Sequence, residues 1–342
     1  MKTTQIRLAA RPQGEPDDSC FATEVVDLPE LVDGQVLLRV VYLSLDPYMR
    51  GRMSDARSYA SPMEVGDVMV GGTVCEVVES REPELPVGTW VLSYSGWQTH
   101  AIATRAEVRP LDPAAAPVST ALGVLGMPGL TAYSGLLEIG RPQEGETVVV
   151  AAATGPVGSA VGQIAKVKGA RAVGIAGGPA KCALLIDELG FDAAVDHRSP
   201  TFRDDLKAAV PDGIDVYFEN VGGAVLDAVL PRLNKYARVP VCGLVSGYNA
   251  TALPEGPDRM GCFLTQVLTR SLTVRGFIVD EFQRSHGRDF VRDMTEWVRD
   301  GAVRYREDVV EGLDNAPEAF RGLLRGKNLG KLLVRVDEDT SA

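Results

Sequence analysis

The middle of the chain repeats one pattern, a short apolar run followed by a segment with helical periodicity. Six apolar runs fit buried strands, at residues 147–153, 171–177, 192–197, 214–220, 237–243 and 272–278. Helices are expected at residues 157–168, 179–189, 202–210, 223–233, 261–269 and 288–300. Because strands that alternate with helices pair in parallel, this pattern predicts an α/β domain with a doubly wound parallel sheet over residues 126–306.

The two ends of the chain have a different texture. Residues 1–125 contain short β-branched runs broken by Gly and Pro, such as QVLLRVVYLSL and VMVGGTVCEVV. Their alternation predicts an antiparallel, β-rich domain. The tail, residues 307–342, has the pattern of strand, helix and strand, and we expect it to rejoin the first domain. A length of 342 residues suits two domains.

Composition excludes several classes of protein. A formal net charge of −11 argues against nucleic acid as a partner, because phosphate binding needs a basic surface. No apolar run approaches the ~18 residues of a membrane span, and the N-terminus lacks the apolar segment of a secretory signal, so we expect a cytoplasmic protein with no membrane partner. The five cysteines form no C-x-x-C pair, and none of the three histidines stands at ligand spacing, so no metal site is expected.

A glycine turn separates the first strand of the expected sheet from its helix. It reads ATGPVG and, with the preceding Ala152, gives the spacing A-x-x-G-x-x-G, a variant of the dinucleotide-binding fingerprint. Gly155 permits a tight turn, and Gly158 lets the helix pack close to the strand. The N–H groups at the helix start then favour a pyrophosphate. The alternative is a strand-to-helix turn without a ligand.

The end of the second strand lacks the acid that an NAD site carries about 20 residues past the turn. The segment there reads GIAGGPAKC, so no carboxylate would repel a 2′-phosphate. Lys181 opens the next helix, and His197 follows the third strand as a second candidate donor. This pattern favours NADP(H) over NAD(H). The alternatives are a solvated Lys181 and a merely exposed His197.

Seven segments, in order, carry a resemblance to a known family. They are LSLDPYMRGRM (43–53), AAATGPVGSAVGQIAKVKG (151–169), AGGPAKC (176–182), LGFDAAVDH (189–197), IDVYFENVGG (214–223), VCGLVSGYN (241–249) and GKNLGKLLV (326–334). The chain resembles the zinc-independent medium-chain dehydrogenases/reductases, within the group of prostaglandin reductases, alkenal double-bond reductases and bacterial curcumin reductases. The resemblance implies a GroES-like β domain, a Rossmann domain, NADPH/NADP+ as cofactor and a homodimer built through the Rossmann sheet edge.

The resemblance also assigns residues to the cofactor. The turn Gly155, Pro156, Val157, Gly158 and Ser159 would hold the pyrophosphate, and Lys181 the 2′-phosphate. Toward the nicotinamide it places Asn220, the loop with Cys242, Gly243, Ser246 and Tyr248, the loop with Phe277, Ile278 and Val279, and Asn328 from the tail. One departure concerns the third strand. The family has Asn-Tyr-Lys after it, whereas this chain has Asp196-His197-Arg198, of which Asp196 is unfavourable to a phosphate.

The implied activity is reduction of the C=C bond of a small-molecule enal or enone. Hydride attack on the β-carbon places negative charge on the carbonyl oxygen, which needs a positioned donor. A phenol is neutral at pH 7 and can donate without a metal, so Tyr48 and Tyr248 are the candidates, beside the ribose hydroxyl of the cofactor. Arg50 and Arg52 are expected to form structural ion pairs. Two other readings stay open: a quinone reductase on the same scaffold and a non-catalytic NADPH-binding protein.

Overall fold

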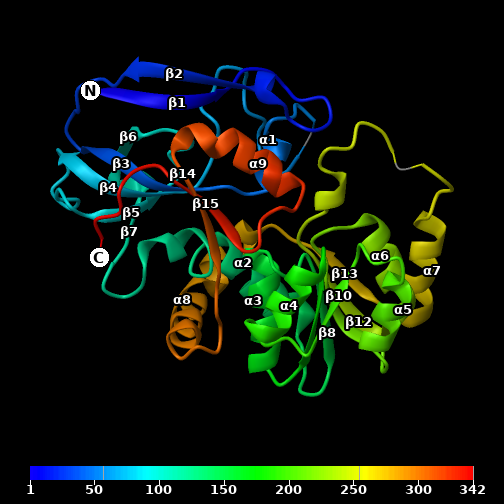
Figure 1. The fold of residues 1–342 in the computed structure, drawn as a ribbon. Helices are drawn as coiled ribbons and strands as arrows, with labels where there is room; N and C mark the ends of the chain where they lie inside the picture. Colours follow the sequence, from blue (N-terminus) through cyan, green and yellow to red (C-terminus); the bar gives the residue numbers. More distant parts are fainter. Residues whose placement is uncertain (57, 254, 342) are drawn as a thin grey trace. The chain divides into compact units, whose positions relative to one another are not determined.

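The computed structural model describes residues 1–56, 58–253 and 255–341, and the chain divides into two compact units. Unit 1 contains Met1–Gly123 and Glu307–Ala342, and unit 2 contains Val124–Arg306. Figure 1 shows the elements of each unit in sequence colours. Each unit is described by itself below.

Unit 2 is built on a parallel sheet of six strands in the order β10-β9-β8-β11-β12-β13. The strands are β8 (Thr147–Ala151), β9 (Arg171–Ala176), β10 (Ala193–Asp196), β11 (Ile214–Phe218), β12 (Leu233–Val241) and β13 (Thr273–Gly276). The chain moves outward from β8 in one direction and then returns to add β11 on its other side. This reversal is the switch point at which doubly wound sheets bind their ligands.

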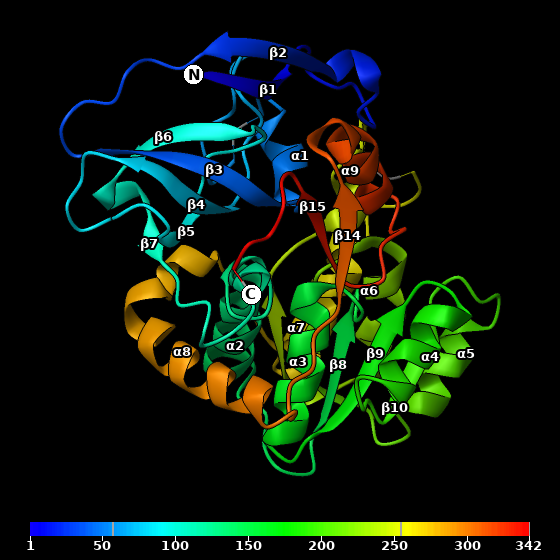
Figure 2. The same ribbon diagram turned by 60° about the vertical axis from the view of Figure 1, so that its left-hand side comes forward.

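The helices of unit 2 follow the strands as the sequence predicts. They are α2 (Met127–Ser134), α3 (Pro156–Val167), α4 (Pro179–Asp187), α5 (Phe202–Ala209), α6 (Gly223–Val229), α7 (Met260–Arg270) and α8 (Gln283–Arg299). Strands β8, β9 and β10 lie side by side in Figure 2, with α3, α4 and α5 packed along them. All five residues of β8 are buried, as the continuous apolar run requires of a central strand.

Four helical segments of unit 2 differ from the sequence-based expectation. Helix α6 ends at Val229 instead of residue 233, because Pro231 has no N–H and leads into a short 3₁₀ turn before β12. Helix α8 begins at Gln283, five residues earlier than expected, and passes through Gly287. Helix α2 and the π-helical segment Gly135–Gly140 after it were not predicted.

Unit 1 combines two antiparallel strands, β1 (Lys2–Leu8) and β2 (Phe21–Asp27), with a sheet of seven strands. That sheet has the order β14-β15-β3-β4-β5-β7, and β6 also pairs with β3. Its members are β3 (Gln35–Ser44), β4 (Thr73–Ser80), β5 (Trp90–Ser93), β6 (His100–Thr104), β7 (Arg109–Pro110), β14 (Glu307–Glu311) and β15 (Lys331–Arg335).

The C-terminal tail supplies two strands of this sheet. Strand β15 pairs antiparallel with β3, and β14 pairs in parallel with β15 (Figure 2). Helix α9 (Ala316–Leu324) connects β14 to β15 along the chain. The core of unit 1 includes Trp97, which stacks on Phe21 and meets Phe320 of α9 edge to face. The short helix α1 (Tyr48–Arg52) adds the buried side chain of Met49 to the same core.

Candidate functional site

The turn after β8 has the close packing expected of a phosphate-binding turn. A Cβ at Gly158 would lie 2.5 Å from the carbonyl oxygen of Ala152, so only glycine fits there without movement. Ala152 itself has a φ of 52°, and its carbonyl accepts a hydrogen bond from Gly155 N at 3.1 Å. Helix α3 begins directly afterwards at Pro156. Its first N–H groups have no partner within the helix and can meet an anion.

The end of β9 is surrounded by basic side chains. A Cβ at Gly177 would lie 2.9 Å from both His197 Nε2 and Arg198 Nε, so the imidazole and the guanidinium group both lie over this glycine. Lys181 stands in the first turn of α4. Burial lowers the pKa of His197, and the charges of Arg198 and Lys181 lower it further against the opposing effect of Asp196. The structure therefore gathers three basic groups where the sequence lacks an acid.

Asp196 has a structural task in this group. Its Oδ1 accepts hydrogen bonds from the backbone N–H groups of Gly178 and Arg198, both at 2.8 Å. Burial acts to raise the pKa of this carboxyl, but the two N–H donors and the neighbouring His197 and Arg198 lower it overall. The carboxylate thus fixes the loop between β9 and α4 and holds Arg198 in place, although the sequence alone marks it as unfavourable.

The loops that follow β11 and β12 are tied together by hydrogen bonds. Asn220 Nδ2 donates to the carbonyl of Ala151 at 2.8 Å, which joins the carboxyl ends of β11 and β8. Ser246 Oγ donates to the carbonyl of Val221 at 2.6 Å, and Cys242 N donates to the carbonyl of Glu219 at 2.9 Å. Both predicted loops are therefore held at the carboxyl edge of the sheet.

Glu219 organises the same edge, and sequence reasoning assigned it no role. Its Oε1 accepts hydrogen bonds from Val221 N at 2.6 Å and Gly222 N at 2.9 Å, and its side chain is almost fully buried. Burial raises its pKa. Its position in the sequence was the available signal, because Glu219 is an acid directly after an apolar strand and directly before Asn220.

Tyr248 lies beside Gly243 in the loop after β12. A Cβ at Gly243 would be 3.2 Å from Tyr248 Oη, so the absence of a side chain at this glycine leaves space for the phenol. Cys242, the residue before, has a thiol whose pKa burial raises to about 12. It is a neutral thiol at physiological pH. The loop thus places the Tyr248 hydroxyl next to the bare backbone of Gly243.

The loop after β13 divides its residues between core and surface. Phe277 is buried and packs edge to face with Phe218 and Phe282, at centroid distances of 6.2 and 5.7 Å. Its side chain therefore belongs to the core of unit 2, and only its backbone is available to a ligand. Ile278 and Val279 are half-buried.

Tyr48, Asn328 and Arg50 belong to unit 1. Burial raises the pKa of Tyr48 well above its usual value, and the nearby groups Asp46, Tyr94 and Tyr59 act in the same direction. Asn328 Nδ2 donates to the carbonyl of Gly330 at 2.6 Å. Arg50 donates to the carbonyl of Gly14 at 3.3 Å and 2.8 Å, a structural contact.

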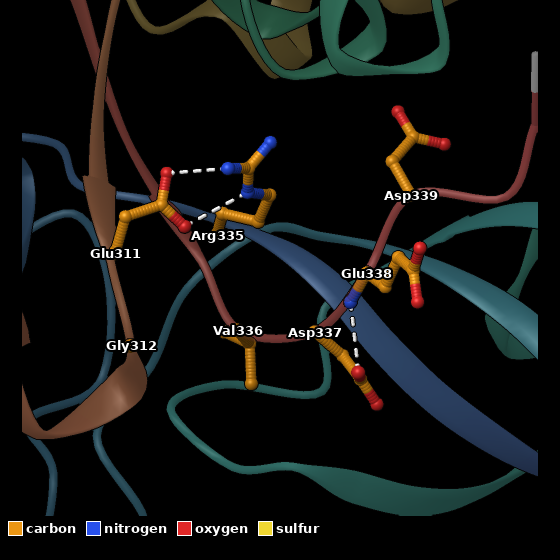
Figure 3. A pocket seen from close by; sticks show the side chains of 7 residues that line it. All are labelled: Glu311, Gly312, Arg335, Val336, Asp337, Glu338 and Asp339. Carbon is orange, nitrogen blue, oxygen red and sulfur yellow. Dashed lines mark hydrogen bonds and ion pairs between the residues drawn. The ribbon is translucent and has the colours of Figure 1, made fainter.

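A pocket of about 540 Å³ lies elsewhere in unit 1 and contains none of the predicted site residues. It is lined by Glu311, Gly312 and residues 335–339, most of them acidic (Figure 3). Glu311 accepts two hydrogen bonds from Arg335, at 2.8 and 2.7 Å. We assign no ligand to it.

Neither a metal cluster nor a membrane-spanning helix is present among the residues that the structure describes. Within residues 1–56, 58–253 and 255–341, no three His, Cys, Asp or Glu side chains are grouped so that they could hold a metal ion. Over the same residues, no helix has both the length and the apolar character needed to cross a membrane.

Comparison with known proteins identifies the family. The chain is 54% identical over 332 residues to the NADPH-dependent curcumin reductase of Escherichia coli, an alignment that covers 97% of this chain and 96% of the relative. The chain belongs to the medium-chain dehydrogenase/reductase superfamily. Two family models match the chain: "N-terminal domain of oxidoreductase" at residues 4–111 and "Zinc-binding dehydrogenase" at residues 156–297.

A second relative and a solved structure agree with this family assignment. Prostaglandin reductase 1 of Oryctolagus cuniculus is 43% identical, covering 93% of this chain and 89% of the relative. The crystal structure of CurA in complex with NADPH from Vibrio vulnificus matches with a TM-score of 0.95 and 54% identity, over 98% of this chain and 100% of that one. These findings confirm the predicted family, the α/β fold class and the two-domain architecture of a β-rich domain with a Rossmann domain.

Proposed function

We propose that this protein is an NADPH-dependent reductase that transfers hydride to the β-carbon of α,β-unsaturated aldehydes and ketones. The observation that carries the proposal is the pair His197 and Arg198 over Gly177, with Lys181 in the first turn of α4, at the place where an NAD enzyme has a carboxylate. The names of the relatives, curcumin reductase and prostaglandin reductase, support the same cofactor and an enone substrate.

The residues present fit the phosphorylated dinucleotide. Gly155 and Gly158 let the turn pack against the Ala152 carbonyl, and the N–H groups at the start of α3 would bind a pyrophosphate, with Pro156, Val157 and Ser159 completing the turn. Lys181 and His197 would bind the 2′-phosphate. The proposed contacts toward the nicotinamide are Asn220, Cys242, Gly243, Ser246, Tyr248, Phe277, Ile278, Val279 and Asn328. When bound, the reduced nicotinamide supplies the hydride.

The chain's own contribution to the reaction is a positioned hydroxyl. A protonated phenol donates a hydrogen bond to the carbonyl oxygen as negative charge develops there, and such a donor is worth about 10²–10³ in kcat where it is preorganised. Tyr248 is the first candidate and Tyr48 the second, with the ribose hydroxyl as the alternative. The raised pKa of Tyr48 keeps its proton in place throughout the physiological pH range.

A panel assay tests this function. Purified protein is mixed with NADPH or NADH and with trans-2-alkenals, linear enones, quinones or simple ketones, and loss of reduced-nicotinamide absorbance is followed. We expect turnover of enals and enones with NADPH and saturated carbonyl compounds as products. Turnover of quinones alone would instead identify a quinone reductase. Binding of NADPH without any turnover would identify a non-catalytic protein.

We also propose that the protein is a cytoplasmic homodimer that pairs through unit 2. Strand β13 forms one end of the sheet, and all four of its residues are exposed. The adjacent helix α7 has no fully buried residue and places Met260, Leu264 and Leu268 on one face, with exposed fractions of 56%, 55% and 79%. An unpaired strand edge next to an exposed apolar helix face is suited to pairing with a second copy. All five cysteines are free thiols, which supports the cytoplasm.

A further inference from the structure

A buried ion pair joins two of the sequence motifs in unit 1. Lys331, in the motif GKNLGKLLV, donates from Nζ to Asp46 Oδ1 at 2.7 Å, and Asp46 belongs to the motif LSLDPYMRGRM. The side chains are only 3% and 8% exposed. Lys331 Nζ also donates to the carbonyl of Leu45 at 2.9 Å, and Ser44 Oγ donates to Asp46 Oδ2. Both charges are therefore satisfied by several partners, as buried charges must be.

The pair fixes the segment that leads into Tyr48. The carbonyl of Asp46 accepts a hydrogen bond from Met49 N at 3.1 Å, which closes the first turn of α1. Leu45 N donates to the carbonyl of Leu332 at 3.2 Å, so backbone and side chain both link this segment to β15. Tyr48 is the first residue of α1, and Met49 beside it is fully buried. The position of Tyr48 thus depends directly on Asp46.

A second carboxyl group lies close to Lys331 but does not compete for its charge. Glu307 is the register partner of Lys331 in the parallel pair β14–β15. Its Oε2 accepts a hydrogen bond from Ser119 Oγ at 2.8 Å. Burial raises the pKa of Glu307 in spite of the nearby lysine. The direct ion pair of Lys331 is therefore the one with Asp46, at 2.7 Å.

We propose that Lys331 and Asp46 are positioning residues that hold the Tyr48 hydroxyl in its working orientation. The inference rests on the proposed function, in which Tyr48 is a candidate donor to the substrate carbonyl. Neither residue touches the substrate or cofactor in this proposal, and the effect passes through the backbone of residues 45–49.

The kinetic test separates positioning from stability. Removing one charge by Lys331→Met leaves the other buried and unpaired, so this variant is expected to unfold at a lower temperature. The double variant Lys331→Met/Asp46→Asn leaves no unpaired charge and is expected to recover most of that loss. Positioning predicts that the double variant still has a kcat at least tenfold below the wild type, with the NADPH dissociation constant within twofold. Lys2→Met, at an exposed lysine of the same unit, is the control and keeps wild-type values.

The same double substitution, made in the Tyr48→Phe variant, tests whether its effect on kcat passes through the Tyr48 hydroxyl. In Tyr48→Phe the double substitution is expected to lower kcat no further, because the group that it positions is already absent. A wild-type kcat in the folded double variant Lys331→Met/Asp46→Asn would overturn the proposal. An equal loss of kcat with and without the Tyr48 hydroxyl would also overturn it.

A readout without turnover keeps this inference separate from the proposed function. Protein labelled with 3-fluorotyrosine gives a ¹⁹F resonance for Tyr48, assigned by its disappearance in Tyr48→Phe. We expect this resonance to shift or broaden in Lys331→Met/Asp46→Asn, while those of the other tyrosines change little. An unchanged Tyr48 resonance rejects the positioning role even if the enzyme is active. A shifted resonance in a protein that reduces no enone supports the positioning role and rejects the proposed function.

Discussion

At the scale of single residues, the basic group at the end of β9 is the proposed determinant of the preference for NADPH over NADH. Lys181, His197 and Arg198 come from two different connections, and Asp196 joins the two by accepting hydrogen bonds from Gly178 N and Arg198 N. A cation and a phosphate form charge-assisted hydrogen bonds, which are about twice as strong as neutral ones. Discrimination between NADPH and NADH is therefore expected to depend on these side chains one by one.

Lys181→Ala is expected to weaken NADPH binding by roughly 10- to 150-fold, because a hydrogen bond to a charged group contributes about 1.5–3 kcal/mol. NADH binding should stay within about twofold, since NADH lacks the 2′-phosphate. Fluorescence titration of the reduced nicotinamides measures both dissociation constants. Equal weakening of both cofactors would show that Lys181 does not contact the extra phosphate.

His197 gives the same site a dependence on pH. Its pKa is lowered in the free protein by burial and by Arg198 and Lys181, so the imidazole is neutral at pH 7. A bound phosphate favours the protonated form, so binding takes up a proton and NADPH affinity rises as the pH falls toward the ordinary value near 6.5. We expect the ratio of NADPH to NADH affinity to rise between pH 8 and pH 6.5. In His197→Gln this ratio should change much less, and a parallel slope would exclude the histidine.

Tyr248→Phe is expected to lower kcat by about 10²-fold, because it removes a donor that acts on developing charge. NADPH affinity should change less, as the hydroxyl faces bare backbone at Gly243. Stopped-flow measurement of hydride transfer with a linear enone separates the chemical step from binding. A turnover number equal to the wild type would remove Tyr248 from the mechanism and leave Tyr48 or the ribose hydroxyl.

At the scale of elements, the junction between β8 and α3 tolerates little change, because its backbone is closely packed at Gly158. Gly158→Ala would place a methyl group 2.5 Å from the Ala152 carbonyl, so strand and helix must separate. We expect a loss of stability of about 1–3 kcal/mol, as for other overpacked positions, together with a marked loss of NADPH affinity. Chemical denaturation and cofactor titration measure the two effects.

Gly287→Ala provides the matched control for that substitution. Gly287 lies inside α8, and a Cβ there would meet nothing closer than the Gln283 side chain at 3.7 Å. This change should raise stability by about 0.5–1 kcal/mol through helix propensity. Similar losses in both variants would mean that the close approach at Gly158 has no special importance.

At the scale of the whole molecule, the proposed homodimer has a direct test. We expect light scattering to give twice the chain mass of 36.5 kDa for the wild type. Leu264→Glu with Leu268→Glu should shift the mass toward that of one chain, since charges would be buried at the interface. Val87→Glu, at an exposed valine of unit 1, should leave the mass unchanged. A wild-type protein that is already monomeric would reject the proposal.

Sequence patterns predicted the parts of the fold that rest on local periodicity. The six strands of the Rossmann sheet were predicted from apolar runs, and their order follows from the general rules of doubly wound sheets. Local exceptions were missed, such as the end of α6 before Pro231 and helix α2. Contacts between distant residues were also beyond prediction. Lys331 and Asp46 are 285 positions apart, and nothing in either motif indicates its partner.

The candidate site likewise divides into residues that local sequence patterns predicted and residues whose contacts they did not predict. The glycine turn and Lys181 were predicted because each follows a strand end, where the fold itself determines the neighbours. Gly177, Glu219 and the supporting task of Asp196 became visible only in three dimensions. Gly177 is covered by side chains from another loop, Asp196 binds the backbone of another loop, and Glu219 binds the backbone N–H groups that follow it. The roles of the individual site residues stay predictions until the variants are measured.

The crowding at Gly177 has a practical consequence for cofactor engineering. Installing an aspartate there would place its Cβ 2.9 Å from both His197 Nε2 and Arg198 Nε. The new carboxylate would pair with the Arg198 guanidinium and favour protonation of His197 instead of binding a ribose hydroxyl. A switch of coenzyme in this scaffold therefore calls for simultaneous replacement of His197 and Arg198, and libraries that vary one position at a time are expected to miss it.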